Sequence, residues 1–338
     1  MPDKKITIED IAQQANVSIS TVSRVLRKSS GVAADKREAV LQAVSDLDYR
    51  PNVFAQSLAS GQSMTIGVIT QNFGSPVYDG ILQGILQGLE GTEYSSLFAD
   101  GRWDKTIEQN ALQAFLDRRV DGLIFVGGQL SKSVMLEVGH KTPLILVART
   151  IDSLAENCIH FDNFQAAYDL TRYLLDMGHR NIAHITAKMH YQETVSDVSQ
   201  RYDGYVQALT DAGIPVDPQL VVEGNLMQQS GALAVEMLLM GKRPFSAIFA
   251  ANDQMAFGAR LALYRRGIRV PDDISLVGFD DEMTAAFTIP PLTTVRQPSV
   301  EMGQAAAAAM LDLIDGKPVA NQTFQSKLIV RESVARLR

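Results

Sequence analysis

The sequence predicts a small all-α head followed by a larger α/β core made of two doubly wound subdomains. Two short helical patterns meet at a tight turn between residues 7 and 26, and a proline-led apolar segment follows at 49–63. From residue 65 onward, continuous apolar strands alternate with helical patterns, which is typical of parallel sheets with helices on both faces. A chain of 338 residues is long enough for two or three folded units.

The first helix is predicted to begin after Thr7. The segment T-I-E-D places an acidic residue three positions after a hydroxyl, which is the pattern of a capping box. Apolar residues then recur at helical spacing on one face: Ile8, Ile11, Ala12 and Ala15. Asn16 comes next, and asparagine tolerates the left-handed conformation that a tight turn requires.

The second helix is predicted from Ser18, whose hydroxyl can cap it. Its apolar face consists of Val22, Val25 and Leu26. A third helix, near Ala34 to Leu47, is expected to close the small core through Val40, Leu41, Val44 and Leu47. This layout is that of a helix-turn-helix, in which the start of the second helix points at base edges in the major groove.

The candidate DNA contacts lie on the second helix and at the start of the first. Arg24 can pair with a guanine through two hydrogen bonds, and Ile19 can touch a thymine methyl group. Hydroxyl groups can reach phosphates or bases. The candidates in the head are Thr7, Ser18, Ile19, Ser20, Thr21, Ser23 and Arg24. Any two short helices joined by a turn give a similar pattern, so the motif needs support from the neighbouring segment of the chain.

The charge of the chain is divided unevenly. A net charge of −7 would ordinarily argue against a nucleic-acid partner. Residues 1–60, however, carry eight Lys/Arg against seven Asp/Glu, whereas the rest of the chain carries 23 against 31. Within 18–37 the balance is five basic residues to one acidic. The acidity therefore belongs to the core, and the head keeps a basic stretch.

Residues 49–63, YRPNVFAQSLASGQS, are predicted to be a linker because a proline stops the third helix and small polar residues end the segment. Several of its residues are unusually apolar for a solvated tether. Together with IEDIAQQANVSISTVSRVL before it, the segment resembles the lactose and galactose repressor (LacI/GalR) family, and both motifs match in order and distance. The family usually has glycine where this chain has Asn16.

The resemblance implies that the linker folds as a hinge helix on DNA. A leucine, here Leu58, would wedge into the minor groove at the operator centre. The remaining hinge contacts would fall on Asn52, Ala55, Gln56 and Ala59. If the match were accidental, Leu58 would be an ordinary core or linker residue.

The predicted strands of the core are short apolar runs: TIGVIT (65–70), GLIFVG (122–127), PLILVA (143–148), NIAHIT (181–186), SAIFAA (246–251) and ISLVGF (274–279). Helical patterns separate them. Strands of this class gather ligands at their carboxyl ends, so two facing units would bind a molecule in the cleft between them.

The core also resembles that family, whose core is similar to the periplasmic sugar-binding fold. The matching motifs are VDGLI (120–124), MGHRNIAHI (177–185), ANDQMAFGA (251–259), VPDDISLVGFDD (270–281) and PPLTTVRQP (290–298). The resemblance implies three domains: a DNA-binding domain at 1–50, a hinge at 51–62, and an effector-binding and dimerisation core at 63–338. The chain would cross between subdomains near 160, 292 and 323. The N-subdomain would hold about 63–160 and 293–322, and the C-subdomain about 161–292 and 323–338.

Polar residues just past two strand ends are candidates for ligand contact. Asn252 follows SAIFAA, Asp280 follows ISLVGF, and Arg201 falls at the family's arginine position in SQRYDGY. The resemblance implies that these three bind effector hydroxyls or carboxylates, and an arginine fork with a carboxylate suits vicinal hydroxyls. Alternatively, Asn252 and Asp280 cap the helices that follow them.

Four aromatic residues and one further arginine complete the candidate effector site. Phe73, Tyr78, Trp103 and Phe161 are possible stacking walls for a sugar ring, although aromatic residues are more often core. The family often has Asp or Asn before Arg149, where this chain has Ala148, so Arg149 would compensate or the effector would be less hydroxylated there. Leu226 stands where the lactose repressor presents an aromatic ring.

Several classes of protein are disfavoured. No run of ~18 apolar residues exists to span a bilayer, and the N-terminus lacks the apolar stretch of a secretory signal, so a cytoplasmic, nucleoid-associated protein without a membrane partner is expected. The lone Cys158 is expected to be a small buried hydrophobe. The five histidines lack metal-ligand spacing, and GILQGILQGLEG resembles a close-packing helix face rather than a dinucleotide fingerprint. We therefore expect no metal, no cofactor and no catalysis.

The resemblance implies a sequence-specific repressor of carbohydrate-utilisation genes that is controlled by a sugar-like effector. A homodimer on a palindromic double-stranded operator is expected, since the chain ends at RESVARLR without the leucine-rich helix of the family's tetramers. The alternative is a sugar receptor of the same core fold that does not bind DNA. The sequence leaves open the effector, the operator and the direction of control.

Overall fold

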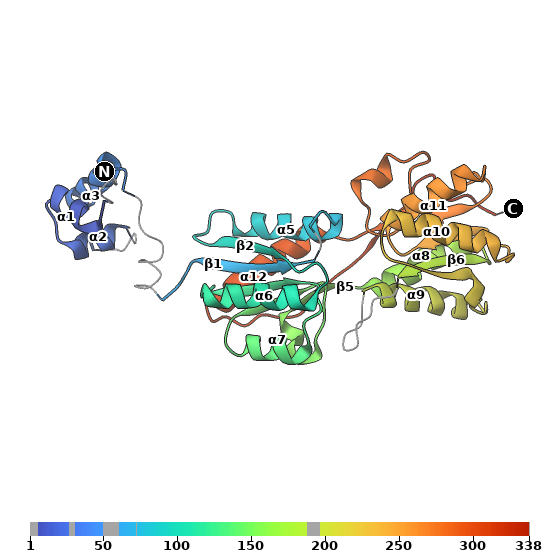
Figure 1. Cartoon of the computed structure of the whole chain (residues 1–338), viewed down its shortest axis with the longest axis horizontal. Coiled ribbons are helices and arrows are strands. Elements are labelled where there is room, and N and C mark those ends of the chain that lie inside the picture. Colours follow the sequence, from blue (N-terminus) through green and yellow to red (C-terminus); the bar gives the residue numbers. More distant parts are fainter. Residues whose placement is uncertain (1–5, 27–30, 50–60, 72, 188–196, 338) are drawn as a thin grey trace. The chain divides into compact units, whose positions relative to one another are not determined.

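The computed structural model describes residues 6–26, 31–49, 61–71, 73–187 and 197–337. The chain divides into two compact units, Met1–Met64 and Thr65–Arg338, which are called the head and the core. Figure 1 traces both along the sequence. The proposed hinge contacts lie outside the described residues: Asn52, Ala55, Gln56, Leu58 and Ala59.

The head is a bundle of three helices: α1 (Ile8–Gln14), α2 (Ile19–Leu26) and α3 (Ala34–Asp46). The predicted capping box is present, because the Thr7 side chain accepts from the Asp10 backbone while the Asp10 carboxylate accepts from the Thr7 backbone. Asn16 has a φ of +48°, the left-handed conformation that the turn between α1 and α2 needs. The helix-turn-helix prediction is confirmed.

The core of the head is formed by Ile11, Ala12, Val22, Val25, Val40 and Ala43. The expectation that Leu41 closes this core was wrong, since its side chain is 53% exposed. Val40 already faces inward, and successive helical residues are turned about 100° apart, so Leu41 points to solvent.

The N-subdomain of the core contains a six-stranded parallel sheet in the order β11-β5-β4-β3-β1-β2. Its strands are β1 (Thr65–Thr70), β2 (Ser95–Asp100), β3 (Gly122–Val126), β4 (Leu144–Val147), β5 (Cys158–Phe161) and β11 (Gln322–Phe324). Its helices are α5 (Pro76–Leu89), α6 (Lys105–Asp117), α7 (Lys132–Gly139) and α12 (Ser299–Ile314). A short 3-10 helix, Asp152–Asn157, precedes β5.

The C-subdomain contains a four-stranded parallel sheet in the order β7-β6-β8-β9. Its strands are β6 (Ile182–Ala187), β7 (Val221–Gly224), β8 (Ala247–Ala250) and β9 (Ser275–Val277). Its helices are α8 (Asn163–Asp176), α9 (Asp197–Asp211), α10 (Gln228–Met240) and α11 (Asp253–Arg265), with 3-10 turns at Pro218–Leu220 and Met283–Ala286. An antiparallel pair, β10 (Thr294–Arg296) with β12 (Lys327–Ile329), adjoins β9 through a bridge between Val277 and Thr293.

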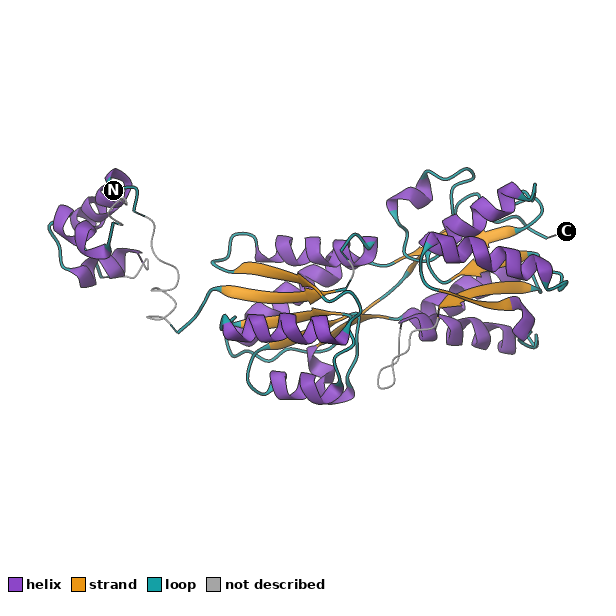
Figure 2. Ribbon diagram, in the orientation of Figure 1, coloured by secondary structure: helices purple, strands orange, loops and turns teal. Residues whose placement is uncertain are grey.

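Both sheets are buried on both faces, as the continuous apolar strands predict, and Figure 2 shows helices on either side of each sheet. In β3, Ile124 and Val126 pack with α5 and α12, whereas Leu123 and Phe125 pack with α6 and α7. The lone Cys158 is fully buried in the second of these clusters, as expected of a small hydrophobe.

The glycines of GILQGILQGLEG lie along the contact between α5 and α12. A Cβ on Gly84 would come within 2.0 Å of the Val300 carbonyl oxygen, and one on Gly88 within 2.6 Å of the Ala307 Cβ. The predicted close-packing role is confirmed, because only glycine lets these two helices approach so closely.

The chain passes between the subdomains three times. It leaves the N-terminal sheet after β5 and enters α8, returns from β10 into α12, and leaves again between β11 and β12. The two subdomains are therefore joined by three connecting segments of the chain. This arrangement places the carboxyl ends of both sheets at the same cleft.

Candidate functional site

A cavity of about 320 Å³ lies between the two subdomains and is lined by residues from both. Most lining residues lie within a few residues of the end of a strand: 74–78 come after β1, 103 after β2, 127–128 after β3, 148–149 after β4, 225–227 after β7, 252 and 254 after β8, and 280 and 282 after β9. Ligands of parallel sheets bind at this edge, and the volume suits a small polar molecule.

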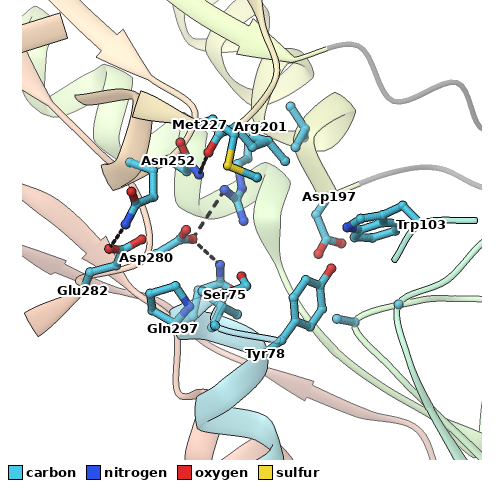
Figure 3. Close-up of a pocket in the computed structure, with 18 of the residues that line it drawn as sticks. Ser75, Tyr78, Trp103, Asp197, Arg201, Met227, Asn252, Asp280, Glu282 and Gln297 are labelled. Atoms are coloured by element: carbon cyan, nitrogen blue, oxygen red, sulfur yellow. Dashed lines mark hydrogen bonds and ion pairs between the residues drawn. The ribbon is translucent and has the colours of Figure 1, made fainter. Parts of the chain in front are cut away.

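Arg201 of α9 is the most constrained side chain of the C-subdomain wall (Figure 3). It is 5% exposed and donates to Asn163 Oδ1 at 2.9 Å and to the Ala251 carbonyl at 2.5 Å. One nitrogen lies 3.5 Å from Asp280 Oδ1, and the guanidinium stacks on the Phe279 ring at 3.9 Å. A cation held by so many partners is fixed in position before any ligand arrives.

Asn252 caps the helix that follows it, as the alternative prediction has it, and also lines the cavity. Its side-chain oxygen accepts from the Met255 backbone at 2.9 Å and so caps α11, while its amide donates to the Leu226 carbonyl at 3.0 Å. Asp280 does not cap a helix. It has a left-handed φ of +116° and accepts from Gln297 at 2.6 Å.

Three carboxylates line the cavity: Asp197, Asp280 and Glu282. Burial raises the pKa of Asp197 to about 6, and Arg201 partly offsets this shift. Burial likewise raises the pKa of Asp280 to about 6, against the same arginine, and that of Glu282 to about 7, with Asp280 adding to the shift. The three carboxylates that line the cavity therefore outnumber its two guanidinium groups, Arg149 and Arg201.

A fourth acid, Asp253, is buried directly behind this wall. It accepts from the Thr294 hydroxyl at 2.7 Å and from the Glu282 backbone at 2.9 Å. Burial, with Asp280 nearby, raises its pKa well above the usual value. Gln254 donates to Glu282 at 2.5 Å, so this acidic group is held in a network of hydrogen bonds.

The N-subdomain wall is aromatic and rich in left-handed backbone. The rings of Tyr78 and Trp103 meet edge to face, with centroids 5.9 Å apart. Trp103 has a φ of +54°, and its backbone donates to Gln71 Oε1 at 2.8 Å. Gly127 has a φ of +67°, and a Cβ there would lie 3.1 Å from the Tyr78 hydroxyl, so glycine leaves room for the aromatic pair.

Glu108 supports this wall from beneath. Its carboxylate accepts from the backbone of Gln129 at 2.8 Å and of Leu130 at 3.1 Å, and burial raises its pKa. Arg149 donates to the Leu130 carbonyl and interacts electrostatically with Glu108. Both of these partners of the Arg149 guanidinium group lie in the N-subdomain.

The structure brings six of the predicted effector residues to the cavity: Tyr78, Trp103, Arg149, Arg201, Asn252 and Asp280. Phe73 is not among the lining residues and is 50% exposed. Phe161 is not among them either, because its position in β5 points it into the core, where its ring meets that of Phe279 at 6.0 Å.

Sequence reasoning missed several lining residues. Asp197 lies one helical turn before Arg201 and so shares its face, which was an available signal. Glu282 and Gln297 come from loops whose approach depends on the crossings between subdomains. Ala148, with a φ of +53°, and Leu226, with a φ of +68°, both line the cavity and bring no polar or aromatic group to it.

The head presents a polar surface that runs from the start of α2 to its last turn. Ser18, Ser20 and Arg24 are exposed, and Ile19 is 48% exposed despite being apolar. Thr21 and Ser23 are half-buried. The Ser18 hydroxyl accepts from the Thr21 backbone at 3.2 Å and bonds the Ser20 hydroxyl at 2.8 Å. Thr7 is exposed as well, within its capping box.

Over the described ranges, no three His, Cys, Asp or Glu side chains form a group that could hold a metal ion. In the same part of the chain, no helix is long and apolar enough to cross a bilayer.

Two family models match the chain. The model described as bacterial regulatory proteins, lacI family, matches residues 7–52, and a periplasmic binding protein-like domain matches residues 171–334. The HTH-type transcriptional regulator AscG of Escherichia coli (strain K12) is 33% identical over 97% of this chain and 98% of its own length. The catabolite control protein A of Priestia megaterium is 32% identical over 95% and 96%.

Solved structures agree. The lac repressor dimer bound to operator and the anti-inducer ONPF is 31% identical, with a TM-score of 0.88, over 98% of this chain and 100% of that one. The transcriptional regulator CelR in complex with cellobiose is 30% identical, with a TM-score of 0.73, over 97% and 99%. The similarity thus covers both the head and the core.

Proposed function

Because the chain belongs to the lacI family of bacterial regulatory proteins, we propose that it is a transcriptional repressor of carbohydrate-utilisation genes, that its head reads operator DNA, and that its core binds a sugar-like effector. The observation that carries the proposal is that one chain holds both an exposed polar surface on α2 and a charged cavity between two subdomains. It would act on the nucleoid in the cytoplasm, with no catalytic role.

The exposed face of α2 would supply the base contacts, from Ile19 in its first turn to Arg24 in its last. Arg24 would pair with a guanine, Ile19 would contact a thymine methyl group, and the hydroxyls around Ser18 would bind phosphates or bases. Thr7, Ser20, Thr21 and Ser23 complete this set. From the hinge, Leu58 would enter the minor groove, with Asn52, Ala55, Gln56 and Ala59 beside it.

The cavity would hold the effector between its two walls. Tyr78 and Trp103 offer ring faces, and Arg201, Asn252 and Asp280 offer the polar groups that fix orientation. CelR binds cellobiose and the lac repressor binds ONPF, so a sugar-like ligand is the starting assumption for this chain.

A surface of the C-subdomain would join two copies of the chain. Large apolar side chains are exposed on three neighbouring segments, α10, α11 and 283–289: Leu233, Met237, Met240, Leu261, Tyr264, Met283, Phe287 and Ile289. Monomers rarely expose so much apolar area in one region. The lac repressor structure is a dimer, and we propose the same homodimer here, on a palindromic operator.

The effector would act on the hinge through neighbouring aspartates. Asp280 faces the cavity, whereas Asp281 is bound at 2.6 Å by both Arg296, at the end of β10, and Arg331, just past β12. Both arginines lie beside crossings between the subdomains. A ligand that moves Asp280 would shift this clamp and change the angle between subdomains.

The direct test is DNA binding by the full chain. Fluorescence anisotropy with duplexes selected from a random pool should return a palindrome, bound more tightly than a scrambled duplex of the same composition. Affinity should fall roughly 10³–10⁵-fold between low and moderate salt if the dimer meets about 6–10 phosphates. Equal affinity for palindromic and scrambled DNA, with sugar binding retained, would favour the sugar receptor without a DNA-binding role.

A further inference from the structure

The charges of the cavity do not balance. Three carboxylates and two guanidinium groups line it: Asp197, Asp280, Glu282, Arg149 and Arg201. The charge of Arg201 is met by Asp280 at 3.5 Å. The charge of Arg149 faces the buried Glu108 behind the wall. Each arginine thus has another acid as its near partner, Asp197 and Glu282 remain in excess, and the cavity presents net negative charge to a ligand when they are ionised.

Glu282 is less suited to hold that charge. It accepts from Gln254, lies beside the buried acid Asp253, and has Asp280 as its charged neighbour. Burial and Asp280 raise its pKa to about 7, so about half of it is protonated at a pH of about 7.

Asp197 is different, because its carboxylate has no fixed partner. Among the described residues it forms neither a hydrogen bond nor an ion pair. The charged groups that act on it are Arg201, which favours ionisation, and Asp280, which opposes it. Figure 3 shows its carboxylate on the same side of the cavity as the rings of Trp103 and Tyr78.

A carboxylate and two aromatic rings that line the same cavity are a favourable environment for an ammonium group. The carboxylate supplies an ion pair, and the negative faces of the rings attract a cation, most strongly when water is excluded. A neutral hydroxyl gains only the hydrogen bond. An anion such as a phosphate meets repulsion from the unneutralised acids.

We propose that the effector carries a protonated amine, which binds between the Asp197 carboxylate and the rings of Tyr78 and Trp103. This inference rests on the proposed function and names the chemical class of its ligand: an amino sugar or a similarly hydroxylated amine. The remaining hydroxyls of such a ligand would meet Arg201, Asn252 and Asp280.

The test compares matched ligands on the full chain by isothermal titration at a pH of about 7. The probes are D-glucosamine and D-galactosamine, the parent hexoses, and the corresponding hexose phosphates. At least one hexosamine should bind about tenfold more tightly than its parent hexose, and the phosphates more weakly than either. Equal or weaker binding of both hexosamines, or no binding of either, would overturn the inference.

Two variants locate the charge. Asp197→Asn should remove the preference for the hexosamine and leave the affinity for the parent hexose within about twofold, because the Asn side chain keeps the shape of Asp and one acceptor oxygen but carries no charge. Glu282→Gln is the matched control and should keep the preference. A preference that survives in Asp197→Asn would contradict the assignment. Melting curves without ligand check that both variants fold.

The same samples separate the two proposals. Operator binding is measured in parallel, without sugar. If the chain binds a palindrome selectively but prefers neutral hexoses, the proposal of an amine-bearing effector is overturned and the proposed function as a DNA-binding regulator stands. Loss of selective operator binding would remove the proposed function itself.

Discussion

The polar surface of α2 and the cavity of the core would each recognise a molecule, yet the recognising side chains are exposed in the first and buried in the second. Ser18, Ser20 and Arg24 are exposed, and the hydrogen bonds of the two serines are exposed as well. Arg201 and Asn252 line the cavity, are almost fully buried, and hold two hydrogen bonds each. In the head, the residues that recognise are largely separate from those that fold; in the cavity they are the same residues.

The difference has a consequence for substitution. An exposed residue of α2 can change without cost to the helix, so operator preference can vary freely. A change in the cavity wall alters both ligand binding and the free energy of unfolding. The two regions should therefore respond differently to single substitutions.

Arg201→Ala should give the largest effect. It leaves Asp280 and Asn163 without their partner in a buried site, which should lower the free energy of unfolding by about 3–5 kcal/mol and abolish effector binding. Denaturant unfolding measures the first and titration the second. Arg172→Ala on α8, whose 3.9 Å ion pair is exposed, is the control and should stay within about 0.5 kcal/mol. An unchanged free energy in Arg201→Ala would refute the coupling of folding and recognition.

Arg24→Ala should lower operator affinity without changing the stability of the head. Operator affinity should fall by about 10–100-fold, the cost of one guanine contact, while thermal unfolding stays the same. Anisotropy with the operator and with random DNA distinguishes the cause. An equal loss on both duplexes would mean that Arg24 contacts phosphate rather than a base.

Asp197→Asn should change the pH dependence of stability. Because burial raises the pKa of Asp197 to about 6, its contribution is present below the unfolded pKa of about 4 and is lost as pH rises through about 6. The Asn variant should be more stable than the natural chain by about 1–2 kcal/mol at a pH of about 8, with the gain fading towards a pH of about 4. Denaturant unfolding across this range measures it, and a gain independent of pH would contradict the cause given.

Thr7→Ala should give the smallest effect, about 1 kcal/mol, through loss of the capping box of α1. Hydrogen exchange of the α1 amides should accelerate, while the core amides keep their protection. Thr7→Ser retains the hydroxyl and should restore the slow exchange. If the alanine variant exchanges at the natural rate, the cap contributes nothing.

Much of the fold is readable from the sequence because burial dictates it. Continuous apolar runs predicted β1, β3 and β4, and the spacing of Gly80, Gly84 and Gly88 predicted a close helix contact. β2 was missed because it is an edge strand with partly exposed residues, which leaves no continuous apolar run. β5 and β7 were missed because His160 and Glu223 interrupt their short apolar runs.

The site was readable where it follows a strand. Asn252 and Asp280 were correctly placed at the cavity, because the carboxyl ends of parallel strands collect ligands, and their contact with an effector stays a prediction. Phe161 was wrongly placed, since its side within β5 depends on the alternation of the strand. Asp197 and Glu282 escaped because burial and charge imbalance appear only once the two subdomains face each other.

The most direct test of the account measures operator affinity with the cavity empty and filled. Anisotropy of a labelled palindromic duplex, titrated with the full chain, would be repeated at saturation with the tightest ligand found by titration. We expect the Kd for the operator to change by about 5–150-fold. A Kd that stays the same while the ligand is demonstrably bound would contradict it.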